Sequence, residues 1–351
     1  MSVLIAGGGA VGAALALAAA REMPAALLSA PLRPAGRFFA LGKTAADFLI
    51  SAAGKPLPDN TPVRRFLLCA GGRRQYLDDD GAPLCRIIAE DALLAWLEEG
   101  LRGSAVVLHG EAQIAAARVA DGAVFVALED GRELSAELLA VADGARSPAA
   151  RVLHTGAAAS VFGQRAVAAA VTARGLEDDT AGQWFSRRNI LALLPAGGGR
   201  FALVWSMPEA EARALEAQGA EAVAAAAVKR AGLSIAAEGA PRGFPLAAVR
   251  RAVRVLPRAA FVGDAAQTIH PLAGQGLNAG LADADLLLRC WRQKDAAAAA
   301  LADYAAGGAR RGAVLHGGTA ALNLIGGLAA PFFAAAAMPP LNRWIARAAN
   351  S

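Results

Sequence analysis

Short apolar runs and a glycine-rich break alternate at the start of the chain. Residues 3–6 form an apolar run typical of a buried strand, and residues 10–21 have the length and composition of a helix. A second apolar run, 25–29, predicts another strand. A strand, a helix and a strand in this order predict a parallel sheet with helices packed on its faces.

The hydrophobic period changes in the middle of the chain. Leucines at helical spacing over 90–102 predict an amphipathic helix. Alternating stretches then predict strands at 106–114, 123–129 and 134–142. Asp121-Gly122 and Asp130-Gly131 lie between these stretches, and such pairs are hairpin signals.

After residue 151 the pattern favours an antiparallel sheet. Strands are expected at 165–172, 190–194 and 201–206, with a glycine turn between the last two. The alanine-rich stretch 209–231 predicts helix, and 258–262 predicts a further strand. The remaining helices are expected at 277–291, 296–306 and 310–324.

Composition excludes some classes of protein. The chain has 351 residues, is 56% hydrophobic and carries a net charge of +5, so it is too apolar for a disordered protein. This length predicts one large or two interlocked domains. The arginines are scattered, with no long basic run and no interleaved aromatics, which does not favour nucleic-acid binding.

The cysteines indicate neither a disulfide framework nor a metal site. Cys69, Cys85 and Cys290 are odd in number, far apart and form no CxxC pair. We therefore expect buried thiols that act as small hydrophobes, as in a protein of a reducing cytoplasm.

The first candidate motif is the glycine-rich turn Gly7-x-Gly9-x-x-Gly12, between the first strand and its helix. In a dinucleotide site, the first glycine permits the tight turn, the second lets a pyrophosphate approach the backbone, and the third brings the helix close to the sheet. A plain structural turn is the alternative. The acidic residue expected at the end of the second strand is absent, and Ser29 stands there; its hydroxyl can still bind a ribose hydroxyl.

The second motif runs from Val141 to Arg151 and includes Asp143, Gly144, Ser147 and Pro148. Its simplest interpretation is the end of a strand followed by a helix that Ser147 caps and Pro148 begins.

The third motif follows the predicted strand 258–262. Residues 263–278 read Gly-Asp-Ala-Ala-Gln-Thr-Ile-His-Pro-Leu-Ala-Gly-Gln-Gly-Leu-Asn. A structural turn before a capped helix is one interpretation. It does not explain why glycines, Asp264 and Pro271 crowd a single loop, whereas a backbone shaped to approach a flat ligand does.

In this order, the three motifs resemble the FAD-binding fingerprints of the single-component flavoprotein aromatic hydroxylases. The third motif is similar to one branch, the ubiquinone-biosynthesis hydroxylases of polyprenylated phenols, and the resemblance extends over about 1–320. It implies an α/β (α+β) fold like that of para-hydroxybenzoate hydroxylase. That fold has a Rossmann-like FAD-binding domain and an inserted antiparallel-sheet substrate domain.

The resemblance also implies a division of the chain. The discontinuous FAD-binding domain is expected at 1–68, 86–158 and 240–308, and the substrate domain at 69–85 and 159–239. Residues 309–351 are then C-terminal helices.

The resemblance implies that FAD lies across two sites. The glycines of the first motif lie under its ADP half, Asp264 accepts hydrogen bonds from its ribityl chain, and the backbone of 274–278 faces the flavin. Arg37 would reach the cofactor. Asp143, Ser147 and Arg151 are associated with the FAD pyrophosphate and the nicotinamide donor. The implied cofactor-binding residues are Gly7, Gly9, Gly12, Ser29, Arg37, Asp143, Gly144, Ser147, Arg151, Gly263, Asp264, Gly274, Gln275, Gly276, Leu277 and Asn278.

The implied reaction needs few catalytic side chains. NADH or NADPH reduces the flavin as a transient donor, O2 forms a flavin C4a-hydroperoxide, and this group hydroxylates an electron-rich phenol. His270, followed by Pro271, is the candidate for a catalytic role, with a structural role in the loop as the alternative. No metal is implied.

Two other functions stay open at this point. One is an FAD monooxygenase for a small soluble aromatic substrate. The other is a catalytically impaired assembly subunit of a quinone-synthesis complex. The latter is motivated by Ser29, Ala35 and Gln267, which replace residues usual in the family.

The stretch 312–342 contains no lysine, arginine, aspartate or glutamate. It is long enough to span a bilayer, although Pro331, Pro339 and Pro340 interrupt it. Leu341, Trp344 and Ile345 beside two arginines predict a short basic amphipathic helix. We expect a cytoplasmic protein, and four roles stay open for this stretch. It could cap the fold, form a subunit contact, make a peripheral contact with the inner face of the membrane, or span the membrane.

Overall fold

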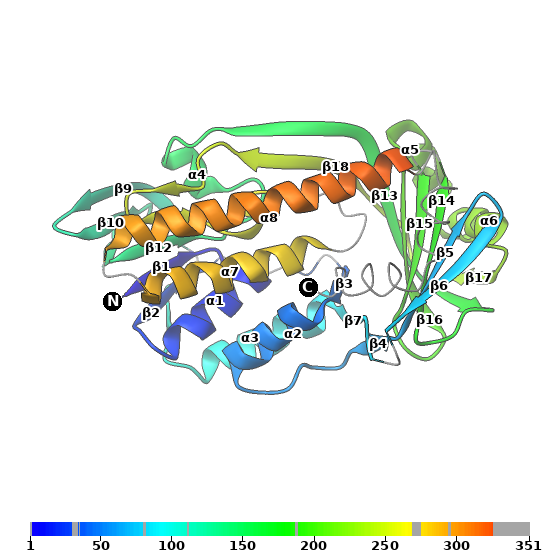
Figure 1. Ribbon diagram of the computed structural model, residues 1–351, viewed down its shortest axis with the longest axis horizontal. Coiled ribbons are helices and arrows are strands. Elements are labelled where there is room, and N and C mark those ends of the chain that lie inside the picture. Colours follow the sequence, from blue (N-terminus) through cyan, green and yellow to red (C-terminus); the bar gives the residue numbers. More distant parts are fainter. Residues whose placement is uncertain are drawn as a thin grey trace.

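The computed structural model describes residues 2–29, 34, 36–79, 82–110, 112–186, 189–268, 275–293 and 296–325. Figure 1 shows a sheet covered by helices at one end of the molecule and a larger sheet at the other. His270, Pro271, Gly274 and Ala35 lie outside the described residues, as does the predicted amphipathic helix within 326–351.

The first sheet is built on the strand–helix–strand unit that opens the chain. Within the described residues it has six strands, in the order β19-β20-β12-β1-β2-β8. β1 (Val3–Ala6) pairs in parallel with β2 (Ala25–Leu28) and β12 (Leu138–Val141), and β12 pairs in parallel with β20 (Ala259–Phe261). The outer strands are β8 (Val107–Leu108), parallel to β2, and β19 (Val255–Leu256), antiparallel to β20. The predicted parallel sheet is confirmed.

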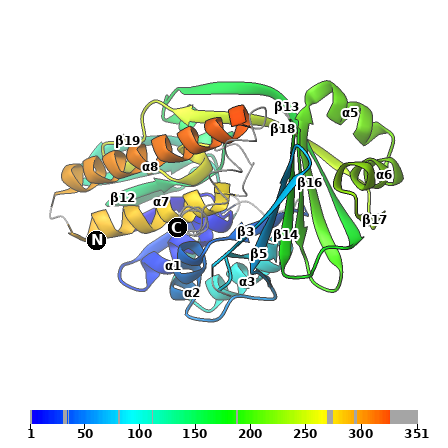
Figure 2. The ribbon, with the colours of Figure 1, turned by 45° about the vertical axis from the view of Figure 1, so that its right-hand side comes forward.

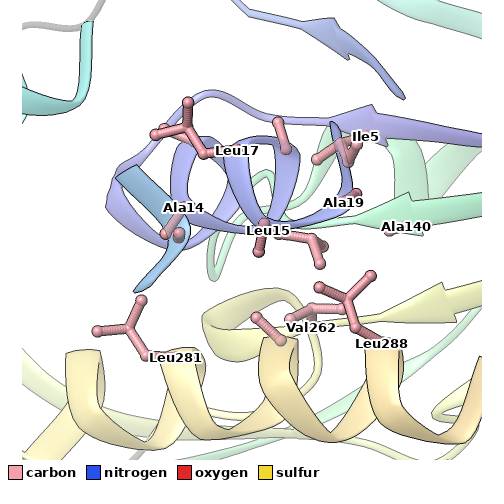
Figure 3. Close-up of a cluster of buried hydrophobic side chains, with 14 of the residues drawn as sticks. Ile5, Ala14, Leu15, Leu17, Ala19, Ala140, Val262, Leu281 and Leu288 are labelled. Atoms are coloured by element: carbon pink, nitrogen blue, oxygen red, sulfur yellow. The ribbon is translucent and has the colours of Figure 1, made fainter. Parts of the chain in front are cut away.

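One face of this sheet is covered by helices. α1 (Ala10–Ala20) is apolar on all sides and is therefore almost entirely buried. It packs against α2 (Lys43–Ala53), α3 (Glu90–Arg102) and α7 (Gln275–Gln293). Figure 3 shows Leu15 of α1 and Ile5 of β1 facing Leu281 and Leu288 of α7 in this core. These side chains are at most 1% exposed, and burying each contributes about 1.5–3 kcal/mol.

The other face is covered by strands. β9 (Ile114–Ala120), β10 (Ala123–Leu128) and β11 (Glu133–Ala136) form a small antiparallel sheet, beside which lies α4 (Pro148–Val152). Leu4, Leu139 and Phe261 of the first sheet pack together with Val124 and Val126 of β10. Burial on both faces explains why the central strands are continuous apolar runs.

In the part of the chain that the structure describes, the helices that pack on the larger sheet through an apolar cluster lie on one of its faces. Among the described residues its strands run β17-β13-β16-β15-β14-β5-β6, and β18 also pairs with β13. α5 (Glu209–Ala217) and α6 (Ala220–Ala231) cover the face that points away from α1 and α7 (Figure 2). The strands are β5 (Arg65–Ala70), β6 (Arg73–Asp78), β13 (Ala157–Arg174), β14 (Thr180–Ser186), β15 (Asn189–Pro195), β16 (Arg200–Pro208), β17 (Ser234–Ala237) and β18 (Arg242–Arg251).

A long ribbon of two strands connects the two ends of the molecule. β13 and β18 pair antiparallel from 157 to 168, with a register shift between Val161 and Gln164, and they run along the top of Figure 1. A small sheet of β3 (Phe38–Leu41), β7 (Cys85–Ala89) and β4 (Thr61–Val63) lies below it in that view. This arrangement confirms the predicted fold class.

Several predicted elements differ from the structure. Of 106–114, only β8 pairs as a strand of the first sheet, and Ile114 begins β9. The stretch 134–142 divides at Glu137 into β11 and β12, which belong to different sheets. The stretch 209–231 is two helices, because Gly219 at φ +86° ends the helical path between them.

α8 (Ala297–Ile325) is one helix where the sequence predicts two. Gly307 and Gly308, between the two predicted ranges, lie in its interior for a packing reason. A Cβ on Gly307 would lie 2.8 Å from Leu286 Cδ2 of α7, and one on Gly308 would lie 2.3 Å from Arg254 Nη1. Their absence of a side chain lets α8 pack closely against its neighbours. No helix among the described residues has both the length and the apolar character needed to cross a membrane.

The domain boundaries remain predictions. The boundary between 68 and 69 falls inside β5, whose whole length pairs within the larger sheet. In the same way, β18 belongs to the long ribbon although 240–308 is expected to be part of the FAD-binding domain.

The cysteines form no disulfide, and Cys69 and Cys85 are buried. Burial raises the pKa of the Cys85 thiol to about 12, so it stays protonated and unreactive. We expect iodoacetamide at about pH 8 to leave Cys85 unmodified in the native protein and to modify it in urea. Peptide mass spectrometry measures this, with partly exposed Cys290 as an internal comparison. Rapid native labelling of Cys85 would contradict the packing described.

Candidate functional site

The predicted site residues converge on one edge of the first sheet. Gly7 follows β1, Ser29 follows β2, Asp143 follows β12 and Asp264 follows β20. Since these strands are parallel, their carboxyl ends meet at the same edge. β2 lies on one side of β1 and β12 lies on the other, so the strand order reverses direction at β1. This edge therefore contains a topological switch point, the place where open parallel sheets bind ligands.

Two of the motif glycines are required by close packing. Gly7 has φ +106°, and a Cβ there would lie 2.5 Å from Ala142 O. A Cβ on Gly12 would lie 1.8 Å from Gly7 O, because α1 passes directly over the turn. The turn therefore brings α1, β1 and the end of β12 together.

Gly9 differs from these two. It has φ −57° and is the N-cap residue of α1, and no atom lies within 4 Å of the position that its Cβ would occupy. No side chain caps the helix there. The first amides of α1 thus face open space, the arrangement that binds a phosphate group through N–H donors and the helix dipole.

Ser29 lies against the same turn. A Cβ on Gly8 would lie 2.0 Å from Ser29 Oγ, and the Ser29 backbone N–H donates to Gly110 O at 3.1 Å. The hydroxyl is therefore beside the glycine turn, and its contact with a ribose stays a prediction.

Asp143 sits at the switch point with part of its carboxyl unsatisfied. Its Oδ2 accepts a hydrogen bond from Ala149 N at 2.9 Å, while its buried Oδ1 has no hydrogen-bond partner among the described residues. Desolvation raises the pKa of this carboxyl, whereas hydrogen bonds from Ser147 and the Ala149 backbone lower it.

The α4 cap is confirmed. Ser147 Oγ accepts a hydrogen bond from Ala150 N at 3.0 Å, and Pro148 occupies the first turn. Gly144, at φ +86°, has open space where a Cβ would lie. Arg151 is exposed on α4, and its role toward a cofactor stays a prediction.

Asp264 projects from a 3-10 turn, Gly263–Ala265, directly after β20. The residue is exposed, yet desolvation by the surrounding protein raises the pKa of its carboxyl and nearby Arg37 lowers it. Ionised Asp264 offers acceptors only, which suits hydroxyl groups of a ligand.

Arg37 is held beside Asp264 by Glu90, which the sequence analysis did not identify. Arg37 Nε donates to Glu90 Oε1 at 2.9 Å, Nη2 contacts the same oxygen, and the Arg37 backbone N–H donates to Oε2 at 3.2 Å. The Glu90 side chain is 4% exposed, against 52% for Arg37. The sequence signal that could have identified Glu90 is its position, an acidic residue directly after the apolar strand β7.

The start of α7 completes the edge. Gly276 has open space at its Cβ position, whereas Leu277 belongs to the apolar core. The Asn278 side chain holds β3 to α7, since its Oδ1 accepts from Gly42 N at 3.1 Å and its Nδ2 donates to Ala40 O at 2.8 Å. Its predicted contribution to cofactor binding is therefore through the backbone, as for Gln275 and Gly276.

Gly280 is a second residue that the sequence analysis missed. A Cβ there would lie 2.6 Å from Val11 Cγ2 of α1 and 3.3 Å from Gly263 Cα. The glycine lets α1, α7 and the Gly263–Ala265 turn meet. A glycine inside a predicted helix does not indicate a close contact by itself, because the contact depends on another helix that crosses at that point.

The residues at this edge fit FAD. An uncapped helix end with an open glycine suits a pyrophosphate, an exposed aspartate suits the hydroxyls of a ribityl chain, and the open positions at Gly144 and Gly276 leave room for a flat group. Within the described residues, no cluster of metal-binding side chains is present.

Comparison with known proteins agrees with this geometry. Residues 73–312 match the family model described as FAD binding domain, which is more than half of the chain. Over 306 residues the chain is 31% identical to the ubiquinone hydroxylase UbiL of Rhodospirillum rubrum, covering 81% of this chain and 71% of that protein. Over 163 residues it is 33% identical to 3-demethoxyubiquinol 3-hydroxylase of Escherichia coli, covering 46% of this chain and only 42% of that protein.

A solved structure shows the same fold. The crystal structure of PqsL from Pseudomonas aeruginosa, described as a probable FAD-dependent monooxygenase, matches with a TM-score of 0.78. The match covers 93% of this chain and 96% of that one at 22% identity. At this identity, the likeness concerns the fold.

Proposed function

Because the chain belongs to the FAD-binding family of the ubiquinone-biosynthesis hydroxylases, we propose that it is a monooxygenase of a polyprenylated phenol. It uses FAD, takes electrons from NADH or NADPH, and places one atom of O2 on the aromatic ring. The convergence of Gly9, Asp143 and Asp264 at one sheet edge is the observation that supports this best.

The chain's own residues bind and orient the cofactor. The amides at the α1 N-terminus donate to the pyrophosphate, and Gly9 leaves space for it. With FAD bound, Asp264 would accept hydrogen bonds from ribityl hydroxyls, and the N-terminus of α7 would favour negative charge on the flavin. The bound flavin supplies the activation of oxygen.

Arg37 gives the site a fixed positive charge. Desolvation raises the pKa of the Asp264 carboxyl, and the charge of Arg37, whose guanidinium Glu90 holds, lowers it. An ionised Asp264 orients the cofactor, because it accepts hydrogen bonds and donates none.

A polyprenyl substrate must be collected from lipid. At about 0.8 kcal/mol per buried CH2, ten methylenes hold the tail in the bilayer by about 8 kcal/mol. We therefore include in the proposal a peripheral contact with the membrane or with subunits of a quinone-synthesis complex. The apolar stretch 312–342 is its candidate.

Complementation of a strain that lacks a quinone-ring hydroxylase tests the function. We expect the wild-type chain and the exposed-surface variant Asp59→Ala to restore the hydroxylated quinone, measured by mass spectrometry. Asp264→Ala should reduce it at least about tenfold, since the ribityl hydrogen bonds to a charged acceptor are lost. Failure of the wild-type chain to restore the hydroxylated quinone would favour an assembly subunit without turnover, and equal restoration by Asp264→Ala would show that Asp264 does not hold the cofactor.

The ligand that the purified enzyme retains distinguishes a polyprenylated phenol from other aromatic substrates. Mass spectrometry of a solvent extract from purified protein should recover a prenylated phenol. Recovery of a small soluble aromatic alone would overturn the substrate class and leave the FAD-dependent hydroxylation in place.

A further inference from the structure

A cationic cavity lies at the far side of the larger sheet. It has a volume of about 320 Å³ and opens between the β5–β6 hairpin and the C-terminal end of α6. Its lining side chains Cys69 and Trp184 belong to the apolar cluster under α6, on the face that points away from α1 and α7 (Figures 1 and 2). The cavity is therefore separate from the edge that holds Gly9 and Asp264.

Positive charge is concentrated in this cavity. Arg73 and Arg74 line it from the hairpin, and Lys229 and Arg230 line it from α6. No described lining residue is acidic, and none of the four cations forms a salt bridge with a described residue. On neighbouring α5, by contrast, Arg213 pairs with Glu209 at 2.7 Å.

Two of the arginines converge on the cavity wall. Burial raises the pKa of the Cys69 thiol while both Arg74 and Arg230 lower it, so both guanidinium groups lie near this sulfur. Arg230 Nε is buried and has no hydrogen-bond partner among the described residues. Desolvation lowers the pKa of the Arg230 guanidinium, and the Cys69 sulfur beside it raises that pKa.

Helix capping explains only half of this charge. Lys229 and Arg230 in the last turn of α6 interact favourably with the helix dipole. Arg73 and Arg74 come from a different element and also line the cavity, with Arg74 paired opposite Cys69 in the β5–β6 hairpin. Between them and β5, the turn glycines Gly71 and Gly72 have positive φ and open Cβ positions, so the backbone leaves the mouth unobstructed.

We propose that this cavity binds a phosphate group, carried by a phospholipid headgroup or by a soluble phosphate ester. Several cations without a carboxylate partner, among them three arginines, match the charge of a phosphate and the paired N–H donors it prefers. Trp184, which packs beside Cys69 under α6, gives the cavity an apolar wall next to these cations.

The double variant Arg74→Gln, Arg230→Gln tests this inference on the full-length, FAD-loaded protein. Titration calorimetry with inorganic pyrophosphate is the soluble probe. Flotation with phosphatidylcholine vesicles, with or without phosphatidylglycerol, is the lipid probe. Arg213→Gln, on the adjacent helix but outside the cavity, is the matched control.

We expect at least one probe to bind wild-type and Arg213→Gln protein equally, and the double variant at least about tenfold more weakly. Binding of pyrophosphate alone identifies a soluble ester, and binding to the anionic vesicles identifies a headgroup. Absence of binding to both probes, or equal binding by the double variant, overturns the inference. FAD content is unaffected in either case, so the result is independent of the proposed hydroxylation.

Discussion

Replacing Gly9 by aspartate is expected to weaken FAD binding at least about 100-fold without destabilising the protein. The position is open and has a φ that any residue adopts, and aspartate is a favourable N-cap residue near the positive end of a helix. Its charge would lie where the pyrophosphate binds, and repulsion at about 4 Å in partly dehydrated surroundings reaches several kcal/mol. Flavin fluorescence titration and thermal unfolding of the apoprotein measure the two effects.

Gly9→Asn is the matched control, since it has nearly the same shape and caps a helix equally well. It should bind FAD more tightly than Gly9→Asp, and the two apoproteins should unfold at similar temperatures. If both variants bind FAD as the wild type does, Gly9 does not face the pyrophosphate.

Replacing Asp283 by alanine is expected to destabilise the protein by about 3 kcal/mol and to lower FAD affinity as well. Asp283 is 1% exposed, and its carboxylate contacts Arg254 at 2.9 Å and Arg311 at 3.1 Å. The backbone N–H of Gly263, the residue before Asp264, is one of the groups that lower the pKa of the Asp283 carboxyl, so the Gly263–Ala265 turn lies beside this carboxylate. Its removal leaves two partly buried cations without their partner and loosens the turn that presents Asp264.

Urea unfolding and FAD titration of Asp283→Ala measure these effects. Asp285→Ala removes an exposed ion pair with Arg289 on the same helix and should change stability by less than about 1 kcal/mol. Equal stability of the two variants would show that the buried cluster does not hold the Gly263–Ala265 turn.

Sequence patterns predicted the parts of the site that depend on local backbone chemistry. Gly7 adopts φ +106°, a Cβ on Gly12 would meet the oxygen of Gly7 only five positions earlier, and Ser147 caps a helix that begins one residue later. Such features repeat wherever the same turn is built, so a short motif identifies them.

The missed features depend on partners distant in the chain. Glu90 binds Arg37 across 53 positions, and Gly280 is required because α1 and the Gly263–Ala265 turn approach α7. α8 was predicted as two helices for the same reason, since Leu286 and Arg254 fill the space beside its interior glycines. A single sequence contains no record of these approaches.

Incubation of the FAD-loaded protein with NADH or NADPH, a polyprenylated phenol in detergent and isotopically labelled O2 tests the central claim most directly. Mass spectrometry of the product should show one labelled oxygen atom on the ring, with the second atom released as water, and Asp264→Ala should form far less product. A product without label, or oxidation of the nicotinamide with no hydroxylated ring from a fully FAD-loaded protein, would contradict the account.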